Sequence, residues 1–168
     1  MPPETSPQMA VICLAAGLMA WACWCDLASR TLPDSLAIGL ALTGIAWQSA
    51  LGDLGWSLLA AALVFAVAGL LWRFGILGGG DVKLLAASAL LPGAAAVPLA
   101  LVMTALAGGL LSAAYVMGRR LAPAIPARGG AIPARIWRAE IRRVRRGGPL
   151  PYAFAITAGT LTSLLGQV

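Results

Sequence analysis

Six apolar runs, separated by shorter polar segments, organise this sequence. They cover residues 9–25, 35–51, 56–72, 82–91, 97–117 and 152–165. An α-helix needs about 20 mostly apolar residues to cross a bilayer, so these runs predict membrane-spanning helices. The fourth run is the shortest, unless Asp81 and Lys83 lie inside its first turns. We therefore predict an all-α polytopic membrane protein, with six transmembrane helices in a single domain over residues 1–168.

Composition strengthens the membrane prediction and narrows the chemistry. The 168 residues are 60% hydrophobic and 11% charged, with a mean hydropathy of +0.88, whereas soluble domains are about half apolar and a quarter charged. Histidine is absent, which excludes Ser-His and Cys-His nucleophile pairs and zinc sites of the His-Glu-x-x-His type. The three cysteines lie in the first run without a Cys-x-x-Cys pair. We expect no metal and no cofactor, which leaves mainly carboxylate chemistry.

Basic residues predict the topology. Arg30 follows the first run, Arg73 and Lys83 flank the loop after the third, and the other nine lie between the fifth and sixth runs. With six spans, all twelve fall on one side of the membrane. Cytoplasmic loops carry the excess of Lys and Arg, so we expect this side of a bacterial inner membrane to be cytoplasmic, with both termini outside.

The arginine-rich loop between the fifth and sixth runs also has a periodic pattern. Its apolar residues fall near helical spacing between the basic ones; they are Ile132, Ile136, Trp137, Ile141 and Val144. This pattern is typical of an amphipathic helix lying on anionic membrane lipid. Nucleic acid is not an expected partner, because the segment is tethered between two predicted spans.

The segment Gly78-Gly79-Gly80-Asp81-Val82-Lys83 stands between the third and fourth runs. An ionised side chain near membrane depth costs about 2.5–3.5 kcal/mol on insertion scales, so Asp81 is a candidate functional residue. The glycines lack a Cβ atom and therefore permit a turn or the close approach of another segment. The alternative is a tight interhelical turn in which Asp81 caps the next helix.

A second acid, Asp26, ends the first run on the same predicted side. If the helices pack together, Asp26 and Asp81 converge at the membrane boundary. Two close carboxylates cannot both ionise easily, so one keeps its proton. The ionised member can then take a proton from water while the protonated member polarises a peptide carbonyl. The alternative is that Asp26 caps a helix or pairs with Arg30, four residues on.

Three segments resemble the type IV prepilin peptidases and their archaeal preflagellin relatives. The segment 78–84 resembles the Gly-x-Gly-Asp motif of that family, 26–34 resembles its first aspartate segment, and 150–156 resembles the opening of its last helix. The resemblance implies an intramembrane aspartyl endopeptidase with Asp26 and Asp81 as the catalytic pair. It also implies supporting roles for Gly78, Gly80 and Lys83.

Asp34 departs from the family pattern, because it stands where the family commonly has asparagine. We expect it to help bind the basic leader rather than to catalyse. No cysteine-rich insert separates the first two runs, so the chain is similar to the short form found with Flp-type pili. The implied substrate is a prepilin or pseudopilin, cut at the cytoplasmic face. Two alternatives are a catalytically silent pilin-binding assembly factor and a small proton-coupled transporter.

Overall fold

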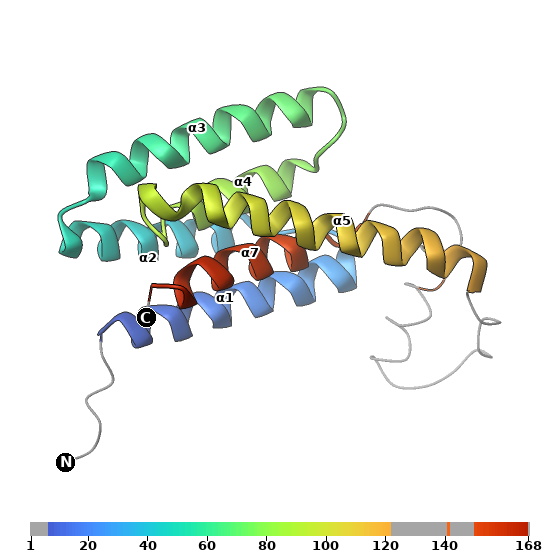
Figure 1. Ribbon diagram of the computed structural model, residues 1–168, viewed down its shortest axis with the longest axis horizontal. Coiled ribbons are helices and arrows are strands. Elements are labelled where there is room, and N and C mark those ends of the chain that lie inside the picture. Colours follow the sequence, from blue (N-terminus) through green and yellow to red (C-terminus); the bar gives the residue numbers. More distant parts are fainter. Residues whose placement is uncertain (1–6, 122–140, 142–149, 168) are drawn as a thin grey trace, which may run out of the picture.

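The computed structural model describes residues 7–121, 141 and 150–167, and the part so described is helical (Figure 1). The elements are α1 (Pro7–Ser29), α2 (Asp34–Leu51), α3 (Leu54–Arg73), α4 (Gly79–Ala89), a short 3-10 helix (Ala94–Ala96), α5 (Val97–Leu121) and α7 (Ala153–Leu165). Each predicted apolar run corresponds to one α-helix. The expected amphipathic helix in the arginine-rich loop falls almost wholly outside the described residues.

Three segments are long and apolar enough to cross a membrane: Pro7–Ser29, Leu54–Arg73 and Ala94–Gly118. Helix α7 is apolar but has 13 residues, and α4 has 11. A rise of about 1.5 Å per residue makes α4 too short to cross the hydrocarbon alone. The prediction of an all-helical membrane protein is therefore confirmed, whereas the prediction of six full spans stays a prediction.

Successive helices run in opposite directions, so alternate connections meet at the same end of the bundle (Figure 1). One end carries the last turns of α1 and α3 together with the first turns of α4 and α7. Arg30, Arg73 and Lys83 belong to this end, as the predicted topology requires. We call it the basic end, and it also contains Asp26 and Asp81.

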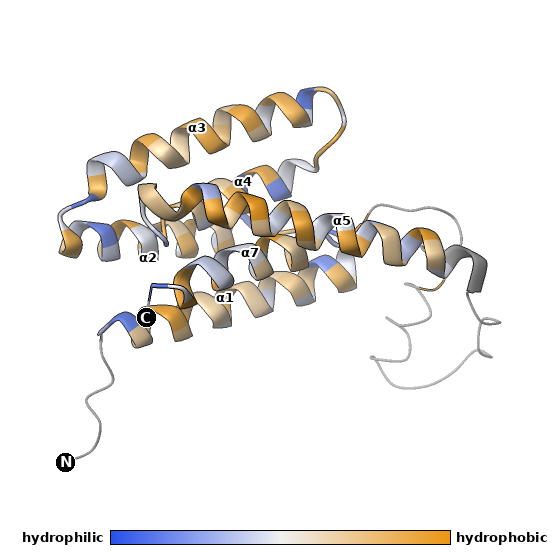
Figure 2. Ribbon diagram, in the orientation of Figure 1, coloured by the Kyte–Doolittle hydropathy of each residue, from blue (hydrophilic) through white to orange (hydrophobic). Residues whose placement is uncertain are grey.

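Many large apolar side chains are exposed on the outside of the bundle, as expected for a surface that faces lipid. Figure 2 shows that apolar residues predominate along the helices. The interior instead holds many small and weakly polar residues, including the buried side chains Ser57, Thr104 and Ser163. Helices in lipid associate by close van der Waals packing and interhelical hydrogen bonds. At Gly159 of α7, an added Cβ would stand 2.5 Å from the carbonyl oxygen of Ala100 in α5. The absence of a side chain at Gly159 thus lets α5 and α7 pack directly together.

Side-chain amides secure the opposite end of the bundle. The Gln48 amide of α2 donates to the Leu91 carbonyl oxygen at 2.9 Å, and the Gln167 amide donates to the Pro92 carbonyl oxygen at 2.9 Å. Both bonds hold the turn that follows α4. Because α4 is short, fixing its far end also fixes the position of its first turn, which contains Asp81.

Candidate active site

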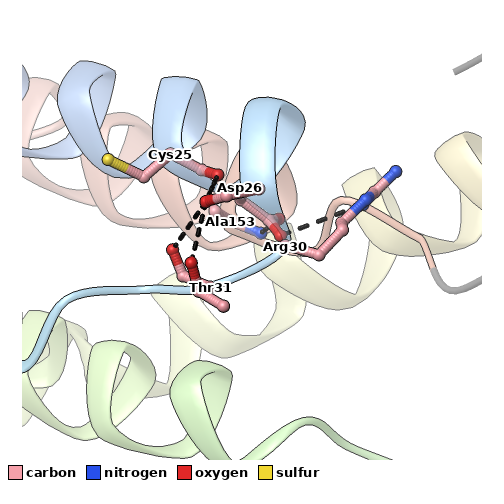
Figure 3. A network of polar contacts seen from close by, with 6 residues as sticks. Cys25, Asp26, Arg30, Thr31 and Ala153 are labelled. Carbon is pink, nitrogen blue, oxygen red and sulfur yellow. Dashed lines mark hydrogen bonds and ion pairs between the residues drawn. The ribbon is translucent and has the colours of Figure 1, made fainter. Parts of the chain in front are cut away.

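Asp26 lies in the last turn of α1 and is buried, with 6% of its surface exposed. The backbone N–H of Ala153, at the start of α7, donates to Asp26 Oδ2 at 3.2 Å. Arg30 Nη1 lies 3.8 Å from Asp26 Oδ1 (Figure 3). A donated N–H and a neighbouring cation both favour an ionised carboxylate. Asp26 is thus a buried carboxylate with both a hydrogen-bond donor and a cation beside it.

The backbone after α1 places Arg30 beside Asp26. Helix α1 ends at Ser29, and Arg30 has a left-handed conformation with φ 57°. Its backbone N–H donates to the Asp26 carbonyl oxygen at 3.0 Å, and the Ser29 hydroxyl donates to the Cys25 carbonyl oxygen at 2.9 Å. A left-handed residue commonly terminates a helix, but for a residue other than glycine it costs about 1 kcal/mol. The pairing alternative for Asp26 is thus present in the structure.

Asp81 lies in the first turn of α4, outside the segments long enough to span the membrane. Burial, and then the charge of Asp26, raise the pKa of Asp81 from 3.8 to about 6. A hydrogen bond from the Gly78 backbone and the charge of Arg30 act in the opposite direction. The charge of Asp26 therefore acts on Asp81, and a working carboxylate pair stays a prediction.

The glycines before Asp81 allow close packing more than they form a turn. Helix α4 begins at Gly79, so Gly79 and Gly80 are helical and Gly78 is the N-cap residue. An added Cβ at Gly78 would stand 2.8 Å from Asp81 Oδ2. At Gly80 it would stand 3.2 Å from the Leu32 Cβ, in the connection between α1 and α2. The expected turn is thus confined to residues 74–78, while the expected close approach is confirmed.

The capping alternative for Asp81 is wrong as stated, because Gly78 is the N-cap residue of α4, but Asp81 still stabilises the start of this helix. It is the third helical residue after the N-cap Gly78, and its carboxylate accepts a hydrogen bond from the Gly78 backbone. An acid at this position, bonding back to the N-cap N–H, stabilises the first helical turn. One contact therefore both begins α4 and orients the carboxylate.

The supporting residues Asp34 and Lys83 contact each other. Lys83 Nζ donates to Asp34 Oδ1 at 2.7 Å, and both side chains are more than half exposed. The pair joins the first turn of α2 to the first half of α4. Together with the contact between Leu32 and Gly80, it brings the two predicted motif segments side by side at the basic end.

Sequence reasoning did not assign functional roles to two residues that the structure places at the acids. Arg30 was recognised only as a possible partner of Asp26. Tyr152, which precedes α7, packs against Gly108 of α5, where an added Cβ would stand 2.9 Å from its ring. Burial and the charge of Asp81 raise the pKa of Tyr152. The resemblance of residues 150–156 to a family segment was the available signal.

Among the residues that the structure describes, no three His, Cys, Asp or Glu side chains form a group that could hold a metal ion. The candidate site thus consists of two carboxylates, one guanidinium group, one phenol and a backbone N–H. This set can transfer protons and can stabilise a change of charge on an oxygen atom.

Fold and site together define an integral membrane protein with an interacting carboxylate pair at the basic end of a helical bundle. The model of the type IV leader peptidase family matches residues 13–113, which is more than half of the chain and includes Asp26 and Asp81. The chain belongs to this family of proteases. Comparison with curated proteins and with solved structures gives no match in either case. Helix α7 lies outside the matched residues, although the backbone N–H of Ala153 at its start donates a hydrogen bond to Asp26.

Proposed function

We propose that the chain is an intramembrane aspartyl endopeptidase that removes the leader peptide from type IV prepilins or pseudopilins of the Flp class. The observation that carries this proposal is the interaction of the buried Asp26 carboxylate with the partly buried Asp81 carboxyl, in which the charge of Asp26 helps to raise the pKa of Asp81 to about 6. Family membership supports a protease whose substrate is a type IV leader. The basic end, where both acids lie, would face the cytoplasm.

Different surroundings give the two acids different roles. Asp26 accepts the Ala153 N–H and lies beside Arg30, so it is the ionised member and acts as the base. Asp81 has a raised pKa, so it takes up a proton more readily than an ordinary aspartate and acts as the acid in its protonated form. Two carboxyl groups whose environments separate their protonation states can divide acid and base chemistry between them.

The reaction begins when Asp26 takes a proton from water and the water oxygen bonds to the scissile carbonyl carbon. Asp81 gives its proton to the carbonyl oxygen, producing a neutral tetrahedral diol. As the C–N bond breaks, Asp26 returns its proton to the leaving nitrogen and Asp81 accepts one from the diol hydroxyl. Both residues end in their starting states, so water is the only co-reactant.

Processing of a co-expressed Flp-type prepilin, followed by gel shift, tests this function. We expect Asp26→Asn and Asp81→Asn each to abolish the shorter product, because each removes one proton-transfer step. Asp53→Asn is the matched control, since Asp53 occupies the N-cap position of α3 at the opposite end of the bundle. All variants must reach the membrane at the unsubstituted level. Cleavage that survives Asp81→Asn would exclude the dyad, and binding of prepilin without cleavage would favour a silent assembly factor.

A further inference from the structure

A lateral apolar groove lies between α3 and α5, and α4 contributes to its wall. Its volume is about 380 Å³. The α3 wall runs from Ala60 to Leu71, with Leu85 from α4 and Leu101 from α5 on the other sides. No charged or hydrogen-bonding side chain lines it. The groove therefore suits an occupant that is itself apolar.

The α3 wall has the spacing of a helix-packing face. Its lining residues recur three or four positions apart from Ala60 to Leu71, which keeps them on one side of a helix. Eleven residues of helix rise about 16 Å, roughly half the hydrocarbon thickness of a bilayer. Leu63 and Val67 on this face are 60% and 61% exposed. A long, straight apolar face of this kind matches one further helix.

One groove residue, Leu85, relates the groove to the candidate site. Leu85 lines the groove and stands four residues after Asp81 on α4. Positions four apart lie on the same face of a helix, about one turn from each other. An apolar helix seated between α3 and α5 would thus end near Leu85. The chain just beyond its end would then reach the Asp81 carboxyl.

We propose that this groove binds the apolar transmembrane helix of the substrate, and thereby sets which peptide bond meets the two acids. The proposal rests on the proposed function, because the occupant is the prepilin itself. A substrate helix explains why a groove residue, Leu85, lies one helical turn from Asp81, whereas a lipid acyl chain would have no relation to the carboxylates. The bond to be cut lies one turn beyond the docked apolar helix.

Photocrosslinking tests the docking directly. A photoreactive amino acid replaces Leu63 in the groove or Phe65 on the opposite face of α3; Phe65 is 53% exposed and so is a matched control. Both chains carry Asp81→Asn, so that an epitope-tagged Flp-type prepilin stays uncut. We expect a prepilin adduct several-fold stronger at position 63 than at position 65. Equal adducts at the two positions, or none at position 63, would overturn the proposal and leave a groove filled by lipid.

The crosslinking result is independent of hydrolysis, because the Asp81→Asn background removes cleavage in every sample. An adduct at position 63 with a prepilin that the unsubstituted chain never cuts would support docking and contradict the proposed peptidase. Cleavage by the unsubstituted chain without an adduct would contradict docking alone. Failure of the function and failure of the groove are thus separate observations.

Filling the groove is a second test with a kinetic readout. Val67→Trp places a large ring in the groove, and we expect it to raise KM for prepilin by at least about tenfold with a smaller change in kcat. Val67→Phe is a milder variant that should raise KM less. Phe65→Trp on the opposite face should leave both constants unchanged. An unchanged KM in Val67→Trp, at equal membrane abundance, would count against docking in the groove.

Discussion

The pair formed by Asp34 and Lys83 is closer than the pair formed by Asp26 and Arg30, at 2.7 Å against 3.8 Å. Burial nevertheless makes the pair of Asp26 and Arg30 the more important of the two. The Lys83 and Asp34 side chains are 52% and 66% exposed, whereas those of Arg30 and Asp26 are 13% and 9% exposed. Both pairs lie at the basic end, and in each pair the aspartate lies in a terminal turn of a helix. They therefore show what solvent does to an otherwise similar interaction.

Water screens the exposed pair, and such pairs contribute about 0–1 kcal/mol to stability. Removing one partner from a buried pair costs about 3–5 kcal/mol, because the other charge is left without compensation. Loss of the longer contact, between Arg30 and Asp26, is thus expected to have the larger effect. It also lies at the carboxylate whose charge acts on Asp81. We infer that Arg30 positions the Asp26 carboxylate and stabilises its negative charge. Lys83 mainly joins α4 to α2.

The largest effect in this comparison is expected from Arg30→Met. Loss of the guanidinium charge leaves a buried Asp26 carboxylate less stable, so we expect prepilin processing to fall by about a hundredfold. Arg30→Lys keeps the charge and should recover part of the rate. Initial rates in membranes with equal enzyme content measure both variants. Wild-type processing by Arg30→Met would show that Asp26 needs no cation.

The second-largest effect is expected in the pH dependence of prepilin processing. In the proposed mechanism Asp81 works protonated, and its pKa is about 6, so kcat/KM should fall as the pH rises through about 6. Because burial raises this pKa above its ordinary value, the same group contributes stability at low pH that is lost as the pH rises through about 6. The positive charge of Arg30 lowers the pKa of Asp81. Arg30→Met should therefore move the falling limb to higher pH.

Rates measured across this range in detergent solution, with the same prepilin, would determine the midpoint for each variant. Arg30→Lys provides the control, since a retained positive charge should leave the midpoint nearly in place. A falling limb that stays put or moves to lower pH in Arg30→Met would contradict the electrostatic role. Loss of rate without a shift would instead indicate that Arg30 only supports the fold.

Gly78→Ala should have an intermediate effect. The backbone at Gly78 has φ −75°, which alanine adopts readily, but its Cβ would stand 2.8 Å from Asp81 Oδ2. The carboxylate must then move, and a misplacement near 1 Å can cost about a hundredfold in rate. We expect a ten- to hundredfold loss of processing, roughly, with little change in thermal stability.

Gly69→Ala on α3 is the matched control for this substitution, because an added Cβ there meets no atom within 4 Å. It should leave both rate and stability close to those of the unsubstituted chain. If Gly78→Ala processes prepilin at the full rate, the position of the Asp81 carboxylate is less critical than the dyad requires.

Much of the helical arrangement could be predicted from the sequence, because apolar runs of this length have few alternatives to a buried or lipid-facing helix. The location of Arg30 and Lys83 at the same end of the bundle also followed from the alternation of helices. The start of α4 could not be predicted, since three glycines suit both a turn and a helix. Packing decided it: Leu32 against Gly80 and the Asp81 carboxylate against Gly78 place these glycines at close contacts.

The site was predictable to a different degree. Asp26 and Asp81 stood out because acids are rare in such a chain. The Ala153 backbone N–H carries no signature in its side chain, and its bond to Asp26 joins residues 127 positions apart. The left-handed conformation of Arg30 likewise has no glycine or asparagine to signal it. Such contacts depend on tertiary structure, so they appear only when the bundle is assembled.

The smallest effects should follow from the exposed pair, and their pattern distinguishes two roles for Asp34. If Asp34 only pairs with Lys83, then Asp34→Asn and Lys83→Met remove the same weak contact and should have equal effects. If Asp34 also meets the basic leader of the substrate, Asp34→Asn weakens binding whereas Lys83→Met leaves the acid available. We expect the second result, with KM raised about two- to fivefold in Asp34→Asn and not raised in Lys83→Met.

Steady-state kinetics of the two single variants and the double variant test this, with increasing salt as a further control. The KM increase in Asp34→Asn should shrink as salt screens the attraction that the substitution removes. Equal increases in both single variants, with no further change in the double variant, would assign Asp34 to the pair alone. The exposed pair would then be a surface contact between α2 and α4, and recognition of the basic leader would have to come from the acids of the dyad itself.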